Sequence, residues 1–117
     1  MKRKFNISKI LNSYLACALW TNELDSNSVE DFDVETKKEA VTIIHRFLKM
    51  ALPLLTDEWD DEQIGHDLWL TRGGHGAGFW DRGLPSGDML TDLCKTIEFH
   101  GEVYEADGVV YINDNAL

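Results

Sequence analysis

The stretch Trp69–Gly83, WLTRGGHGAGFWDRG, decides how this chain of 117 residues is expected to fold. From His66 onward apolar and polar residues alternate, and the runs HDLWLTR and GAGFWDR flank a glycine-rich turn. Alternation with a period of two is typical of half-buried strands, and a short glycine turn between two such runs is typical of a β-hairpin. We therefore predict a β-hairpin over residues 66–82.

The faces of this predicted hairpin are the same whether its loop is Gly73-Gly74 or Gly73–Gly76. The face expected to pack on helices carries Leu68, Leu70, Ala77 and Phe79. The opposite face carries Asp67, Trp69, Thr71, Gly78, Trp80 and Arg82. If no other segment covers that second face, it is an aromatic and arginine-rich patch of the kind enriched at binding hot spots. In the alternative interpretation another segment covers it, and both tryptophans belong to the core.

The hairpin therefore supplies the candidate binding residues. They are Trp69, Arg72, His75, Phe79, Trp80, Asp81 and Arg82. Two ion pairs are expected to steady the register, one between Asp67 and Arg82 and the other between Arg72 and Asp81.

The rest of the chain predicts helices and a second hairpin. A first helix begins near Ser8, which caps it. A second starts after Asp33 and runs to about Leu52, where Pro53 stops it. TDEWDDEQIG is expected to form a short acidic turn capped by Thr56, and a third helix to span residues 87–97, capped by Ser86.

The closing segment EVYEADGVVYIND contains Asp107-Gly108, a two-residue turn signal that places Tyr104 opposite Tyr111 and Val103 opposite Ile112. The predicted fold class is α+β, with about three helices packed on a small antiparallel sheet of two hairpins, about four strands in all. The length predicts a single domain, 1–117, helical over 1–63 and hairpin–helix–hairpin over 64–117.

Composition and charge narrow the function classes. Apolar residues make up 44% and charged residues 27%, as in ordinary globular proteins, and the apolar runs are shorter than the roughly 20 residues of a membrane span. Cys17 and Cys94 lie among apolar residues and are expected to be buried free thiols, which favours the cytoplasm. The net charge of −10 repels nucleic acid and anionic membranes, but attracts a basic protein surface.

Catalytic motifs fail at specific positions. GGHGAG lacks the GK[ST] ending of a phosphate-binding loop, and no GxSxG supplies a nucleophile for a His/Asp pair. We expect no cofactor and no metal site. The alternative that remains open is a small-molecule or metal-dependent activity around His66, His75 and Asp81. A homodimer, formed through an open sheet edge or the tryptophan face, is a third alternative.

The segment GHDLWLTRGGHGAGFWDRG, with the DML helix and the VYEADGVVYI hairpin that follow, resembles a group of small uncharacterised proteins encoded by tailed bacteriophages. That group carries a WLTRxGHGAGFWDRG motif, in which asparagine usually stands in place of Gly73. The resemblance covers roughly residues 64–113. It implies an accessory phage protein, acting in a bacterial cytoplasm, that binds and inhibits a host protein such as a defence or nucleic-acid-handling complex.

Overall fold

The computed structural model describes residues 3–117 as four α-helices and one two-stranded antiparallel sheet. The helices are α1 (Ile7–Thr21), α2 (Val34–Ala51), α3 (Asp61–Arg72) and α4 (Gly87–Cys94), and the strands are β1 (Glu102–Ala106) and β2 (Val109–Asn113). Short 3-10 turns lie at η1 (Val29–Asp31), η2 (Leu52–Leu54), η3 (Phe79–Asp81) and η4 (Lys95–Ile97). The predicted α+β class is confirmed, but with four α-helices and two strands.

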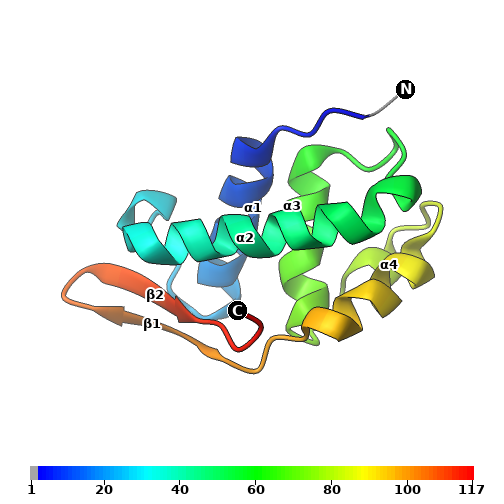
Figure 1. Cartoon of the computed structure of the whole chain (residues 1–117). Coiled ribbons are helices and arrows are strands. Elements are labelled where there is room, and N and C mark those ends of the chain that lie inside the picture. Colours follow the sequence, from blue (N-terminus) through cyan, green and yellow to red (C-terminus); the bar gives the residue numbers. More distant parts are fainter. Residues whose placement is uncertain (1–2) are drawn as a thin grey trace.

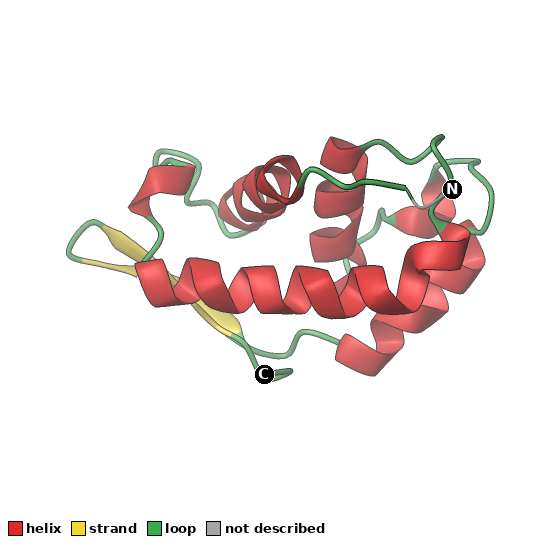
Figure 2. Ribbon diagram, turned by 45° about the horizontal axis from the view of Figure 1, so that its top comes forward, coloured by secondary structure: helices red, strands yellow, loops and turns green. Residues whose placement is uncertain are grey.

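Helices α1 and α3 lie side by side, and α2 crosses both of them (Figure 1). Gly65 permits the close approach of α1 and α3. A Cβ added at this position would lie 2.1 Å from Ser13 Oγ and 2.2 Å from the carbonyl oxygen of Ile10. The strands lie at one end of the molecule, next to the start of α2 (Figure 2).

The hairpin predicted over residues 66–82 is wrong, because residues 61–72 form α3 instead. Asp60 caps this helix by accepting a hydrogen bond from Gln63 N at 2.8 Å, so the cap is not Thr56. The helix ends in a Schellman motif: Gly74 has a positive φ of 69°, and the next amide donates to the carbonyl of Leu70 at 3.0 Å. The glycine pair that suggested a hairpin turn therefore terminates a helix.

Helical periodicity is hidden in α3 because the helix is buried on nearly every side. Its buried residues are Ile64, Gly65, Asp67, Leu68, Trp69, Leu70, Thr71 and Arg72. An amphipathic helix shows apolar residues three and four apart, whereas a helix enclosed all round shows no such pattern. The predicted division between residues 63 and 64 falls inside this helix.

The other helices follow their predictions more closely. Asn6, not Ser8, caps α1. Helix α2 starts after Asp33 as predicted, and the side chain of Asp33 caps it. Ser86 precedes α4 as predicted, but its side chain makes no capping hydrogen bond, and α4 ends at Cys94 before turn η4.

The second predicted hairpin is confirmed in its register. Val103 pairs with Ile112 and Tyr104 with Tyr111, and the turn residues Asp107 and Gly108 both have positive φ, of 53° and 80°. This is the conformation that a two-residue turn of the I′ type requires.

Both cysteines are buried and unpaired, as expected. Within residues 3–117 no helix combines the length and the apolar character that crossing a membrane requires.

Candidate binding groove

The two tryptophans of the predicted hairpin face lie in different environments. Trp69 is only 1% exposed, and its Nε1 donates to Thr21 Oγ1 at 2.8 Å while its ring packs edge-on against Tyr14. Trp80 is 41% exposed and lies beside Gly78. The proposed binding face containing both residues is therefore wrong, and Trp69 belongs to the core.

Arg72 is fully buried, and its guanidinium links α3 to α1, to η4 and to the C-terminal segment. Its guanidinium donates to both carboxylate oxygens of Asp114 at 2.8 Å, to the hydroxyl of Tyr14 at 2.7 Å and to the carbonyl of Ile97 at 2.6 Å. The predicted pair with Asp81 is therefore wrong.

These contacts shift the ionisation of the buried groups. Burial is the largest single influence on Asp114 and opposes its charged form. The hydrogen bonds from Arg72 and from the amide of Ala116, together with the positive charges of Arg72 and Arg46, outweigh it and lower the pKa of Asp114. For Tyr14 burial dominates and raises the pKa to about 12.

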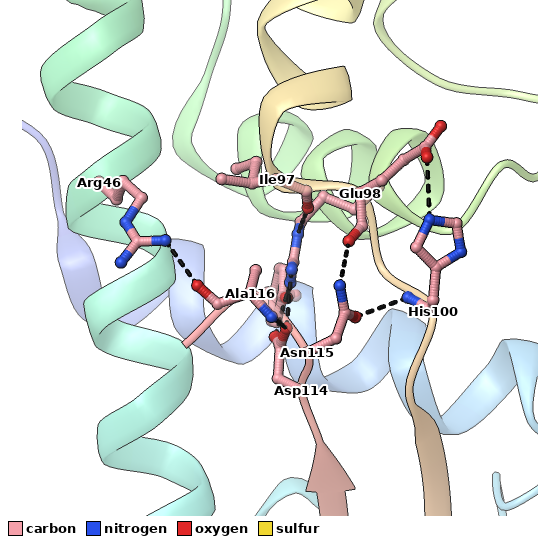
Figure 3. A network of polar contacts seen from close by, with 9 residues as sticks. Arg46, Ile97, Glu98, His100, Asp114, Asn115 and Ala116 are labelled. Carbon is pink, nitrogen blue, oxygen red and sulfur yellow. Dashed lines mark hydrogen bonds and ion pairs between the residues drawn. The ribbon is translucent and has the colours of Figure 1, made fainter.

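The C-terminal residues extend the hydrogen bonds around Arg72 to helix α2 and to the segment between η4 and β1 (Figure 3). Asn115 accepts a hydrogen bond from the amide of His100 at 2.6 Å and donates to the carbonyl of Glu98 at 2.9 Å, while Arg46 of α2 donates to the carbonyl of Ala116 at 2.6 Å. These bonds join the end of the chain to α2 and to the segment before β1, so the cluster is structural.

The predicted Asp67–Arg82 pair is confirmed, although it joins a helix to a loop instead of two strands. Arg82 Nη2 lies 2.6 Å from Asp67 Oδ1, and Gln63 Nε2 donates to the same carboxylate at 2.8 Å. The hydrogen bonds to Asp67 raise the pKa of Arg82. Asp67 is fully buried and satisfied, which makes the pair a stabilising contact for the loop that follows α3.

The remaining predicted site residues are dispersed. Phe79 is fully buried and stacks on Phe47 at 5.3 Å between ring centroids, His75 lies in the C-terminal cap of α3, and Asp81 is exposed in η3. Across residues 3–117, no three side chains of His, Cys, Asp or Glu are grouped so as to hold a metal ion.

A groove lined by residues of α1, η1 and α3 contains an exposed tryptophan. It has a volume of about 650 Å³ and lies between α1, α3 and η1. Its lining residues are Lys9, Asn12, Ser13, Ala16, Cys17, Trp20, Val29, Glu30, Glu62 and His66. Trp20 is 61% exposed, and its indole stacks on the His66 ring, with centroids 6.4 Å apart and planes inclined by 21°. The groove thus presents an exposed indole that α3 holds in place.

The groove is bordered by acidic residues. Glu30 and Glu62 line it against a single basic residue, Lys9, and Asp60 and Asp61 adjoin Glu62 in a neighbouring polar depression. The pKa of Glu30 is lowered, mainly by a hydrogen bond with its own backbone and next by a hydrogen bond with the side chain of Ser28. This carboxylate therefore stays charged at neutral pH.

Neither potential nucleophile of the groove is activated. Cys17 is buried, and burial, reinforced by the negative charge of Asp67, raises the pKa of its thiol to about 12. The hydroxyl of Ser13 donates to the carbonyl of Ile10 at 3.2 Å, and no hydrogen bond joins it to His66 within the described part of the chain. A neutral thiol and an unassisted hydroxyl are weak nucleophiles.

Sequence reasoning missed Trp20 as a binding residue, although a signal was present. The apolar positions that predict the buried face of the first helix are Leu11, Tyr14, Leu15, Ala18 and Leu19. Trp20 is the only tryptophan of this segment and lies outside that stripe. A large apolar side chain outside the buried face of a helix is a candidate for contact with another molecule.

No protein-family model, no curated protein and no solved structure matches this chain.

Proposed function

We propose that this chain is a non-enzymatic binding protein that takes a basic segment of a partner protein into the groove between α1 and α3. The observation that carries the proposal is the indole of Trp20, 61% exposed and stacked on His66 within an acidic groove. Tryptophan is enriched among residues that dominate binding energy, and its face attracts lysine and arginine side chains.

Charge supports a basic partner. The chain has a net charge of −10, and residues 21–35, which lead from α1 through η1 to α2, contain six acids and no lysine or arginine. Complementary charge accelerates encounter and fixes orientation more than it adds affinity. In this proposal the carboxylates steer the partner, and Trp20 supplies the contact that holds it.

The resemblance of residues 64–113 to phage proteins favours a host protein as the partner. We infer an accessory protein, acting in a bacterial cytoplasm, that inhibits a defence or nucleic-acid-handling complex by occupying a basic surface. A surface that binds nucleic acid is rich in lysine and arginine, and an acidic protein competes for it directly.

The test compares affinity capture from host lysate by the wild type, Trp20→Ala and the control Trp80→Ala, followed by titration of the recovered partner in purified form. Trp80 is the matched control because it is also an exposed tryptophan but lies outside the groove. We expect Trp20→Ala to weaken binding by at least about thirtyfold, since truncation of a central hot-spot residue costs about 2 kcal/mol or more. Equal binding by all three proteins would remove the groove from the proposal.

A small-molecule ligand is the second candidate, because a volume of about 650 Å³ lies within the range of known ligand sites, about 300–1,000 Å³. His66 lines the groove, whereas His75 and Asp81 do not. The purified protein should then retain a small molecule in native mass spectrometry, and Trp20→Ala should release it.

A further inference from the structure

The two edges of the terminal sheet differ in whether their backbone groups are paired. On the β2 edge, Asp33 N donates to the carbonyl of Val110 at 2.9 Å, and Phe32 forms a bridge with the same residue. On the outer side of β1, no backbone hydrogen bond to another segment is found within residues 3–117. The sheet can therefore be extended only at β1, which lies at the rim of the molecule (Figure 1).

The register identifies which backbone groups of β1 are free. Directly opposed residues of an antiparallel pair alternate between pairs that exchange hydrogen bonds and pairs whose polar groups point away from each other. The carbonyl of Val110 is bonded to Asp33, away from β1, so its pair with Glu105 is of the second kind. By alternation the pair of Val103 with Ile112 is also of the second kind. The amides and carbonyls of Val103 and Glu105 therefore face solvent along the edge.

The side chains around this edge carry one sign of charge. Residues 98–107 contain four carboxylates, Glu98, Glu102, Glu105 and Asp107, and no lysine or arginine. Four of the five residues of β1 are exposed. Exposed edge strands are normally protected by charged side chains, proline or a bulge. In β1 the charged residues are Glu102 and Glu105, which oppose pairing with another acidic strand but not with a basic one.

Tyr104 provides an aromatic surface beside the same edge. It is 43% exposed and stacks on Tyr111, with ring centroids 5.3 Å apart. A strand placed next to β1 would bring alternate side chains beside the Tyr104 ring, where a lysine or arginine side chain packs well on an aromatic face.

We propose that the free edge of β1 binds an extended basic segment of a partner protein by strand addition. The backbone groups of Val103 and Glu105 form the new ladder, and the surrounding carboxylates select lysine and arginine at alternate positions of the added strand. Charge favours this occupant over a second copy of the chain, because self-pairing brings two acidic strands together. The proposal does not depend on the groove between α1 and α3.

The test uses a synthetic peptide in which lysine and valine alternate, with a glutamate–valine peptide as the charge control. Binding is measured by fluorescence anisotropy, and amide exchange is followed by NMR. We expect only the lysine peptide to bind and the amides of Val103 and Glu105 to become protected on binding. Binding without protection of these amides would be non-specific attraction to an acidic protein, and would overturn the proposal, as would no binding.

Two substitutions at Glu105 separate the contribution of its backbone amide to peptide binding from the contribution of its carboxylate. Glu105→Ala removes the carboxylate and keeps the amide, whereas Glu105→Pro removes both, without removing a donor to β2. We expect Glu105→Pro to bind the lysine peptide at least about fivefold more weakly than Glu105→Ala, since a backbone hydrogen bond contributes about 1 kcal/mol. Equal affinities would refute strand addition. If Glu105→Pro fails to fold, protection of the Val103 and Glu105 amides in the wild type on adding the lysine peptide decides the question. If these amides become protected without peptide as the protein concentration rises, the edge binds a second copy of the chain, and the proposal is overturned.

Discussion

Replacing Asp114 by Asn is expected to lower the free energy of unfolding by about 3 kcal/mol, because it leaves a buried guanidinium without its counter-charge. Arg72 is fully buried and the side chain of Asp114 is 6% exposed. Removing one partner of such a pair costs about 3–5 kcal/mol. The lower end applies here, since Tyr14 and the carbonyl of Ile97 still accept hydrogen bonds from Arg72.

This loss corresponds to a large fall in melting temperature. An unfolding entropy of about 2.1 cal/mol/K per residue makes 3 kcal/mol worth about 12 °C in a chain of this length. The matched control is Asp92→Asn, because Asp92 pairs with Lys95 at 3.1 Å but its side chain is 71% exposed. Exposed pairs contribute about 0–1 kcal/mol. Urea and thermal unfolding measure both variants, and equal effects would refute the assignment of Asp114 as a buried structural partner.

The pH dependence follows from the lowered pKa of Asp114 in the folded protein. The contribution of the ion pair is fully present above the unfolded-state pKa of about 3.9 and is lost as pH falls through the lower folded-state value. The stability difference between wild type and Asp114→Asn should therefore be constant near neutral pH and shrink below about pH 4. A difference that does not change over an acid titration would contradict this reasoning.

Two further predictions concern packing and burial. Gly65→Ala should destabilise the protein by about 1–3 kcal/mol in urea unfolding, because its Cβ would overlap the carbonyl oxygen of Ile10, which lies 2.2 Å away. Gly76→Ala is the control, since a Cβ there meets nothing within 4 Å, and an equal loss would contradict the packing of α1 on α3. Cys17 and Cys94 should resist an aromatic disulfide reagent in the native state and react on denaturation, because burial raises the pKa of each thiol to about 12. Stoichiometric labelling of the native protein would show that the thiols are accessible.

Local signals predicted the elements whose geometry depends on a few neighbouring residues. Asp33 and Pro53 bracket α2, as an N-cap and a helix stop should. Asp107-Gly108 predicted both the turn and the register of the closing hairpin, because two consecutive positive φ angles match the twist of the flanking strands. In each case the information lies within one turn of the chain.

The segment from Asp61 to Gly83 was misassigned because its signals fit two structures. A glycine at positive φ suits a hairpin turn and a helix C-cap equally well, and Gly74 is used as the cap. Enclosure of α3 on nearly all sides removes the helical period from its sequence. The partner of Arg72 lies 42 residues further along the chain, so no local pattern identifies it.

By itself, then, the sequence determined the α+β class, the extent of α2, the closing turn with its register, the buried cysteines and the acidic surface. Only the tertiary structure decided which tryptophan is exposed, because burial of a side chain depends on the distant segments that cover it. Trp69 lies under α1, whereas Trp20 of α1 faces the groove beside His66 of α3. The candidate binding surface moved from the glycine-rich segment to that groove for this physical reason.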